Sequence, residues 1–290
     1  MKPRIVFFGT PDFVLPIANA LKDNFEVVAV VTAPDSIDSR KKTSLPSPVK
    51  QFALKHAIPA FSFEQFDNGA IQQLQTFNPD LFVTAAYGKI IPPEILILPK
   101  FGSLNIHPSL LPKYRGTSPI QSALLDGGKT TGVTIMQMDT KMDHGPLLAQ
   151  WKYTIPPHAT FAQLHQILFQ QATNKLPQTI TAFLKGEIKP EPQNDKEATY
   201  CHKIKKEDGY FDSSNPPTPE TLDRMIRAYY PWPTAWTRVK LKTGEEKILK
   251  LLPEAKVQLE GGKMMTIKDA LNGYPELTQL FEELMGTQKK

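Results

Sequence analysis

Residues 104–116 read Leu-Asn-Ile-His-Pro-Ser-Leu-Leu-Pro-Lys-Tyr-Arg-Gly, and this stretch decides the fold that we predict. Its first residues alternate apolar and polar side chains, which is the pattern of a β-strand, so Asn105 and His107 lie on one face. Pro108 cannot donate to a sheet ladder, which predicts that the strand ends there. His107 is then at the carboxyl end of a strand, where open α/β sheets hold their ligands.

The sequence on both sides of this stretch alternates between short apolar runs and segments with helical periodicity. Alternating strands and helices indicate parallel βαβ units with right-handed crossovers. We therefore predict an α/β fold with a Rossmann-like, mostly parallel sheet. The predicted strands are 5–8, 27–31, 80–85, 102–107, 132–138 and 147–155. The predicted helices include 47–56, 66–77, 119–125 and 160–184.

A change of composition predicts a domain boundary near residue 190. Residues 189–197 are polar and contain two prolines, a pattern typical of a linker. We predict a first domain over 1–188, a linker over 189–199 and a second domain over 200–290. The second domain is expected to be small and rich in β-strands, with a helix near 219–229 and strands within 234–252 and 255–259.

Composition sets limits on the compartment and the partners. The single cysteine, Cys201, excludes an internal disulfide framework and a multi-cysteine zinc site. No apolar run approaches the roughly 20 residues that span a bilayer. The net charge of +5 permits a phosphate-rich partner without requiring one. These features favour a cytoplasmic protein that does not enter a membrane.

Several common enzyme classes lack their sequence signals. The first predicted strand ends at Gly9, but Thr10-Pro11-Asp12-Phe13 follows in place of the glycines that bring a pyrophosphate close to a helix. No Walker-type phosphate loop is found. The Gly-x-Ser-x-Gly nucleophile motif is absent as well, which argues against covalent catalysis by serine.

Asp143 is the candidate partner of Asn105 and His107. It follows the predicted strand 132–138, and the carboxyl ends of neighbouring parallel strands meet at one sheet edge. The three side chains would supply an oxyanion donor, an acid/base and an orienting carboxylate. Spacing alone favours a structural interpretation, in which a capping asparagine, a buried histidine and a turn aspartate have no catalytic role. His144 is expected to be exposed and not to bind a metal.

A long polar loop before the helix at 47–56 carries Arg40, Lys41 and Lys42. Long loops in compact domains are usually functional or disordered. The triplet suits phosphate groups, although a run of three charges on a loop is more often a solvated surface.

The motifs together resemble the folate-dependent formyltransferases, in particular the members that act on methionyl-tRNA. Asn105–Gly116 resembles the family signature and Met142–Pro146 its second motif. Further stretches that resemble these members are Phe8–Phe13, Lys41–Lys42, Pro46–Lys50, Tyr87–Pro92, Gly132–Met138, Lys203–Gly209, Ile226–Pro233 and Gln258–Met265.

The resemblance reverses the structural interpretation of the polar trio. It implies catalytic roles for Asn105, His107 and Asp143, and contacts with the folate for Ser109, Leu110, Leu111 and Pro112. It also implies that Arg40, Lys41 and Lys42 contact the tRNA. The co-substrate would be 10-formyltetrahydrofolate, with no metal, and the acceptor initiator methionyl-tRNA.

The same resemblance implies an enzyme with a formyltransferase domain followed by a shortened, OB-like, tRNA-binding domain, and we expect a monomer. The main alternative is a folate-dependent N-formyltransferase that acts on a sugar nucleotide or another small amine. A folate- or RNA-binding protein without turnover is the alternative outside enzymes.

Overall fold

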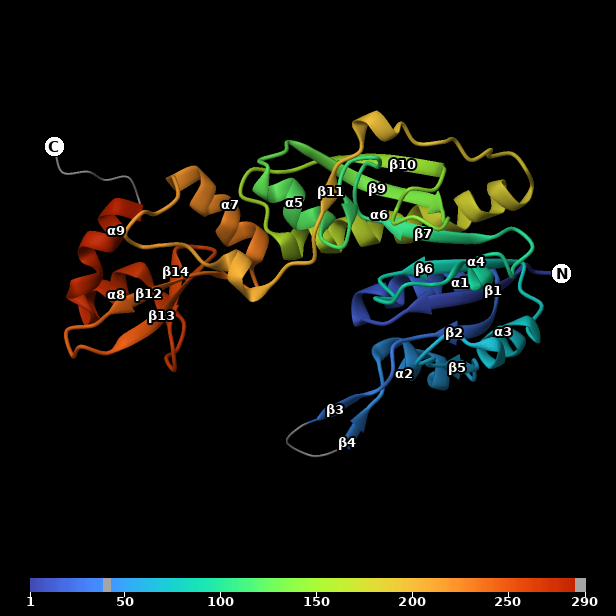
Figure 1. The fold of residues 1–290 in the computed structure, drawn as a ribbon, viewed down its shortest axis with the longest axis horizontal. Coiled ribbons are helices and arrows are strands. Elements are labelled where there is room, and N and C mark those ends of the chain that lie inside the picture. The colour runs from blue at the N-terminus through green and yellow to red at the C-terminus, as the bar shows by residue number, and fades with distance from the viewer. Residues whose placement is uncertain (39–42, 285–290) are drawn as a thin grey trace. The chain divides into compact units, whose positions relative to one another are not determined.

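The computed structural model describes residues 1–38 and 43–284, and these form two compact units (Figure 1). Unit 1 comprises Met1–Arg115, Gly132–Tyr153 and Gln166–Tyr200, whereas unit 2 comprises Gly116–Thr131, Thr154–His165 and Cys201–Lys290. The units are interleaved along the sequence. The predicted limits 1–188, 189–199 and 200–290 stay a prediction, although the stretch expected to be a linker lies within unit 1.

A seven-stranded sheet forms the centre of unit 1, in the order β10-β9-β7-β6-β1-β2-β5. Its strands are β1 (Arg4–Gly9), β2 (Glu26–Val31), β5 (Ala60–Phe61), β6 (Leu81–Ala85), β7 (Ser103–His107), β9 (Thr130–Gln137) and β10 (Leu147–Thr154). The pairs β1-β2, β1-β6, β2-β5 and β6-β7 are parallel, whereas β7-β9 is antiparallel. The prediction of a mostly parallel α/β sheet is confirmed.

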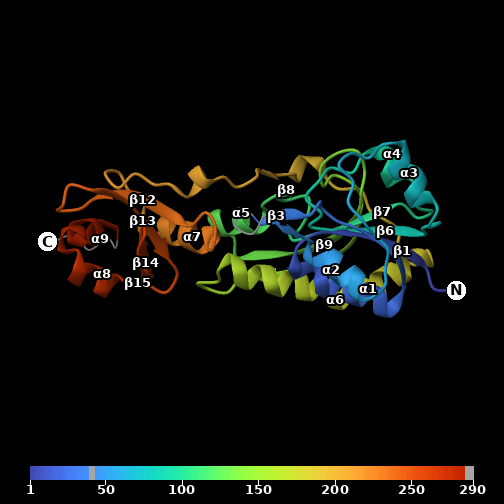
Figure 2. The same cartoon turned by 90° about the horizontal axis from the view of Figure 1, so that it is seen from below.

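Helices cover both faces of this sheet. Figure 2 shows α1, α2 and α6 on one face and α3 and α4 on the other. They are α1 (Leu15–Asn24), α2 (Pro48–Lys55), α3 (Asn68–Gln75), α4 (Pro93–Leu96) and α6 (Phe161–Leu184), with a 3-10 helix η1 (Asp12–Val14). Four consecutive residues of β1, Ile5 to Phe8, are fully buried because both faces are covered.

Ser47 caps α2 as the sequence predicts, because its side chain accepts a hydrogen bond from the backbone N–H of Lys50. The sequence did not predict α4, β5 or the antiparallel hairpin of β3 (Ser36–Asp38) and β4 (Thr43–Leu45). These elements are two to four residues long, too short to show a period in the sequence.

Unit 2 contains a four-stranded antiparallel sheet, so a small β-rich second domain is confirmed. Its strands are β12 (Ala235–Lys240), β13 (Glu246–Leu252), β14 (Lys256–Leu259) and β15 (Met265–Thr266). Its helices are α5 (Pro119–Leu125), α7 (Pro219–Tyr229), α8 (Ile267–Gly273) and α9 (Thr278–Leu284), with 3-10 helices η3 (Lys206–Gly209) and η4 (Pro275–Leu277). Buried Leu249, Val257 and Phe281 belong to one apolar core, and α5 packs against α7.

Two short strands, β8 (Arg115–Gly116) and β11 (Tyr200–Cys201), form a separate two-stranded sheet, and η2 (Asp195–Glu197) precedes β11. Over the described part of the chain, no helix combines the length and the apolar character that crossing a membrane requires.

Candidate active site

The structure brings Asn105, His107 and Asp143 together at the carboxyl end of β7. The side-chain amide of Asn105 donates to Asp143 Oδ1 at 3.2 Å. Nδ1 of His107 lies 3.6 Å from Asp143 Oδ2. Both β7 residues therefore reach the same carboxylate, as their spacing of two along a strand requires. Their catalytic roles stay a prediction.

Asp143 reaches this place by a route that the sequence argument did not foresee. The sequence pattern predicted two parallel strands with their carboxyl ends side by side, but β9 runs antiparallel to β7. Gln137 at the end of β9 pairs with Leu104 near the start of β7, while Thr134 pairs with His107. The carboxyl end of β9 is thus at the opposite end of β7, and the loop after β9 carries Asp143 back to His107. The expected proximity is found, but the reason given for it is wrong.

His107 is held with one ring nitrogen committed to the backbone. Its side chain is only 4% exposed, and Nε2 lies 2.9 Å from the carbonyl oxygen of Tyr114. A carbonyl can only accept, so we assign the proton of the neutral ring to Nε2. Nδ1 does not share this contact with the backbone, and it faces Asp143.

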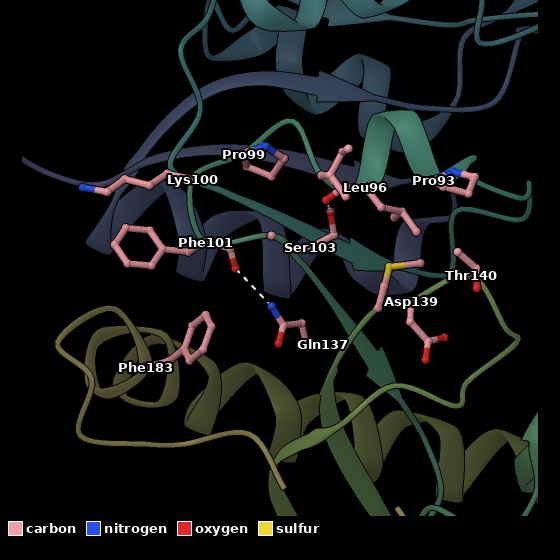
Figure 3. Close-up of a pocket in the computed structure, with 13 residues that line it drawn as sticks. Pro93, Leu96, Pro99, Lys100, Phe101, Ser103, Gln137, Asp139, Thr140 and Phe183 are labelled. Atoms are coloured by element: carbon pink, nitrogen blue, oxygen red, sulfur yellow. Dashed lines mark hydrogen bonds between the residues drawn. The ribbon is translucent and has the colours of Figure 1, made fainter. Parts of the chain in front are cut away.

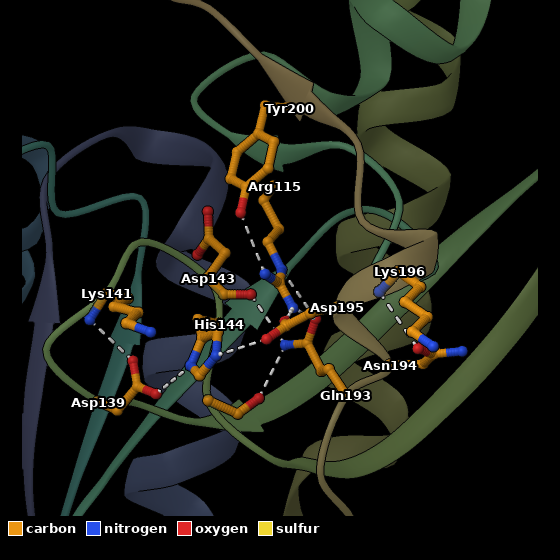
Figure 4. Close-up of polar contacts among 11 residues, drawn as sticks. Arg115, Asp139, Lys141, Asp143, His144, Gln193, Asn194, Asp195, Lys196 and Tyr200 are labelled. Carbon is orange, nitrogen blue, oxygen red and sulfur yellow. Dashed lines mark hydrogen bonds and ion pairs between the residues drawn. The ribbon is translucent and has the colours of Figure 1, made fainter.

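The backbone around Asp143 forms a tight turn. Asp143 has a φ of 48°, in the left-handed region that aspartate tolerates better than most residues. A Cβ on Gly145 would lie 1.9 Å from the carbonyl oxygen of Gln137, so only glycine fits there. The side-chain amide of Gln193 donates to the carbonyl oxygens of Asp143 and Gly145, both at 2.8 Å (Figure 4).

Arg115 binds the side-chain oxygen of Gln193. Its guanidinium is 1% exposed and donates to Gln193 Oε1 from Nε at 3.0 Å and from Nη2 at 2.8 Å. It also donates to Asp195 Oδ1 at 2.8 Å and to the Tyr200 hydroxyl at 3.2 Å. Burial alone would lower the pKa of Arg115, but the hydrogen bonds to Asp195 and Tyr200 outweigh burial and raise it. The arginine therefore stays charged.

His144 is not the freely exposed side chain that the sequence suggested. It is 28% exposed, and its Nδ1 lies 2.5 Å from Asp139 Oδ2. Its Nε2 lies 3.4 Å from Asp195 Oδ2 (Figure 4). The imidazole thus connects the loop after β9 with the segment that carries Gln193.

The predicted folate-contacting residues Ser109, Leu110, Leu111 and Pro112 form a rigid loop. Ser109 is fully buried and its hydroxyl donates to the carbonyl oxygen of Lys113 at 2.6 Å. Thr134 Oγ1 donates to the Ser109 carbonyl at 2.6 Å and accepts from the Leu111 N–H at 3.2 Å. The side chains of Ser109 and Leu111 are thus turned inward, and any contact with a folate would come from Leu110, Pro112 or the backbone.

The predicted tRNA contacts Arg40, Lys41 and Lys42 lie outside the described residues. The base of the hairpin that leads to them is fixed by an ion pair. Lys50 Nζ contacts both carboxylate oxygens of Asp35, at 2.9 and 2.8 Å, and the hydroxyl of Ser44 donates to the same carboxylate. The hydrogen bond from Lys50 lowers the pKa of Asp35, so the pair is charged at neutral pH.

A cavity of about 620 Å³ lies in unit 1 beside the start of β7 (Figure 3). Phe101 and Phe183 approach one another edge to face at 6.4 Å on one side of it. Ser103, the first residue of β7, and Asp139 supply polar groups in its wall. Residues 137–140 line the cavity, and 138–140 of these belong to the same loop that continues to Asp143. The cavity and the polar trio therefore share β7 and this loop.

The comparisons with known proteins identify the family of this chain. A family model described as formyl transferase matches residues 3–180, and the chain belongs to that family. Solved structures with the same fold include a sugar N-formyltransferase from Shewanella sp FDAARGOS_354, with a TM-score of 0.66, 17% identity, and coverage of 88% of this chain and 98% of that one. At this identity the likeness shows the fold alone.

The curated relatives carry a more particular name. The methionyl-tRNA formyltransferase of Roseiflexus sp. (strain RS-1) is 43% identical over 248 residues, which covers 83% of this chain and 76% of the relative. The methionyl-tRNA formyltransferase of Hahella chejuensis (strain KCTC 2396) is 36% identical over 315 residues, with 97% of each chain covered. The resemblance seen in the sequence motifs is confirmed.

Proposed function

We propose that this chain is an enzyme that transfers the formyl group of 10-formyltetrahydrofolate to the α-amino group of methionyl-tRNA. The observation that carries the proposal is the meeting of Asn105, His107 and Asp143 at the end of β7 in a chain of the formyl transferase family. Relatives named methionyl-tRNA formyltransferase favour this acceptor over a sugar amine.

The reaction needs a neutral amine and a stabilised oxyanion. The amine nitrogen attacks the formyl carbon and a tetrahedral intermediate forms, whose oxygen is negative. His107 protonated at Nδ1 and the amide of Asn105 stabilise that oxygen. Asp143 supports the imidazolium and accepts the proton that the amine loses, directly or through water. The bond between carbon and the folate nitrogen then breaks, and that nitrogen takes up the proton that Asp143 accepted from the amine.

The cavity beside β7 suits the ring system of the donor. It is concave, its wall combines aromatic and aliphatic side chains with a few polar groups, and its volume fits a ligand of this size. Residues 137–140 join its wall to the loop that carries Asp143. In this arrangement, the extended formyl donor places its ring system in the cavity and its formyl group near Asn105, His107 and Asp143. Leu110 and Pro112 are further contacts.

Ile97 offers a test of this placement. It lines the cavity but is 77% exposed, so Ile97→Trp adds bulk at the mouth without disturbing the core. The KM for the formyl donor should rise several-fold while the KM for methionyl-tRNA stays unchanged. Leu54→Trp, at an exposed position of α2, serves as the control. A rise only in the KM for methionyl-tRNA would assign the cavity to the acceptor.

The acceptor end of the tRNA is expected to meet the hairpin formed by β3 and β4. Replacement of Arg40, Lys41 and Lys42 by alanine should raise the KM for methionyl-tRNA and flatten its dependence on salt, because fewer phosphate contacts form. If the same replacement raises the KM for a minimal aminoacyl ester equally, these three residues do not contact the tRNA.

One assay separates the main proposal from its alternatives. The protein is incubated with the formyl donor together with methionyl-tRNA, free methionine or a panel of amino sugar nucleotides. Formylmethionyl-tRNA is the product that supports the proposal, and another formylated amine supports the small-amine alternative. No product in any reaction supports a binding protein without turnover.

The remaining parts of the proposal concern setting and assembly. We expect a monomeric protein of the cytoplasm that acts in translation initiation, and the mechanism above uses no metal ion. Size-exclusion chromatography with light scattering tests the monomer, and activity that survives a strong chelator would agree with the absence of a metal.

A further inference from the structure

Residues 191–195, in the stretch that the sequence marks as a linker, lie against the turn that carries Asp143. Glu191 and Leu147 exchange two backbone hydrogen bonds, of 2.7 and 2.9 Å, just beyond that turn. Two residues further on, Gln193 donates to the carbonyl oxygens of Asp143 and Gly145. This stretch is therefore attached to unit 1 beside the candidate site.

The orientation of the Gln193 amide follows from its partners. The guanidinium of Arg115 can only donate, so it requires Gln193 Oε1 on its side. The carbonyl oxygens of Asp143 and Gly145 can only accept, so they require Nε2. A flipped amide would place like groups together at both ends, and the side chain therefore has one stable orientation.

Arg115 is in turn fixed by its own surroundings. It is nearly fully buried, and its Nη2, which also contacts Gln193, donates to Asp195, while Nη1 donates to the Tyr200 hydroxyl. Arg115 is the first residue of β8 and ends the loop that begins at Pro108, directly after His107. The end of that loop and the turn that carries Asp143 are thus joined through Arg115 and Gln193 (Figure 4).

We propose that Gln193 and Arg115 are positioning residues, which act through the backbone of Asp143 and Gly145 to hold the Asp143 carboxylate against Asn105 and His107. The inference rests on the proposed formyl transfer. Neither residue touches a substrate in this scheme. Their contribution is to fix a left-handed turn whose displacement by about 1 Å would lower the rate about 100-fold.

Two substitutions at Gln193 separate its contacts. Gln193→Ala removes both ends of the connection. Gln193→Glu keeps an acceptor for Arg115 but loses both donated hydrogen bonds, and it turns a carboxylate oxygen toward two carbonyls. The matched control is Asn194→Ala, because the amide of Asn194 bonds within its own segment, to Lys196 and Glu197.

Both Gln193 variants should lower kcat about 10- to 100-fold with unchanged KM for donor and acceptor, whereas Asn194→Ala stays near the wild type. In an Asp143→Ala background, Gln193→Ala should cause no further loss, because the carboxylate that it positions is gone. An equal loss in both backgrounds, or a wild-type kcat for Gln193→Ala, would overturn the inference.

Hydrogen exchange supplies a measurement that does not depend on activity. The amides of residues 139–146 should exchange faster in both Gln193 variants, while exchange in the core strands β1 and β6 stays as in the wild type. Unchanged exchange in residues 139–146 would contradict the proposal that Gln193 holds this turn. If the wild-type protein transfers no formyl group, the proposed function fails, and the exchange experiment still decides whether Gln193 holds the turn.

Discussion

His107 and Asp143 face one another across 3.6 Å, but different parts of the chain hold them in place. A partner of the His107 ring is the carbonyl of Tyr114, seven residues away in the proline-containing loop that follows β7. The turn that carries Asp143 is held by Gln193, which is fifty residues away. One half of the candidate site is thus organised locally and the other half by a distant segment.

This difference shows why local sequence patterns describe one half of the site better than the other. A strand that ends at a proline places His107 at the end of that strand and on the same face as Asn105, which follows from local geometry. The position of Asp143 depends on contacts that form only after the sheet and residues 191–195 have assembled. Perturbations of the two halves should therefore have different consequences.

The largest expected effect on kcat follows from removal of the His107 side chain. His107→Ala should lower kcat by about 10²- to 10³-fold, because one stabilising donor for the oxyanion is lost. The fold should remain, as measured by circular dichroism and thermal unfolding, since the ring lies at a strand end. Near-normal turnover of this variant would show that His107 takes no part in the mechanism. The comparison between the two halves of the candidate site would then no longer hold.

The next largest effect tests the turn that carries Asp143, which the distant residue Gln193 holds in place. Gly145→Ala places a Cβ 1.9 Å from the carbonyl oxygen of Gln137, so the turn must move. We expect kcat to fall about 100-fold, since a displacement of about 1 Å at the carboxylate is enough. Gly273→Ala, where a Cβ meets no atom within 4 Å, is the control. Equal kcat values for the two variants would show that the turn tolerates displacement.

A smaller effect is expected in the half that is held locally. Ser109→Ala removes the hydrogen bond to the Lys113 carbonyl, which should lower the free energy of unfolding by about 1 kcal/mol in urea titrations. Hydrogen exchange in residues 139–146 should stay at the wild-type rate, because Gln193 and not Ser109 holds that turn. Faster exchange there would mean that the two halves are not independent.

The smallest effect is a dependence of stability on pH. The hydrogen bond from Arg115 lowers the pKa of Asp195 below its usual value of 3.8. Its contribution to stability is therefore complete above the usual pKa and disappears as the pH falls through the lowered one. The Tm of Asp195→Asn should be below that of the wild type at neutral pH and converge with it as the pH falls through the lowered pKa of Asp195. A Tm difference that does not change with pH would contradict this.

Most of the fold could be predicted from the sequence because its elements have long periodic patterns. The helices α5 (Pro119–Leu125) and α7 (Pro219–Tyr229) begin and end at the predicted residues. The hairpin of β3 and β4 was expected to be a loop, since strands of three residues are too short to show a period. Residues 189–199 were predicted to be a linker because their composition is polar, and composition does not reveal tertiary contacts.

The candidate site divides in the same way. Asn105 and His107 are two residues apart on a strand that ends at Pro108, and that arrangement follows from local geometry alone. Asp143 was placed beside them by an argument about parallel strands, although β9 proves to be antiparallel to β7. Gln193 and the structural role of Arg115 were missed, because a single polar residue in a polar segment gives no signal of its distant partner.

By itself, the sequence determined the alternating α/β architecture, the strand that delivers Asn105 and His107, and the motifs of the formyl transferase family. Only the tertiary structure decided the direction of β9, the route that returns Asp143 to the site, and the connection from Arg115 through Gln193 to the backbone of that turn. The physical reason is the range of the interactions. Alternation and proline geometry act between neighbours, whereas these hydrogen bonds join residues 48 to 78 positions apart and exist only in the folded chain.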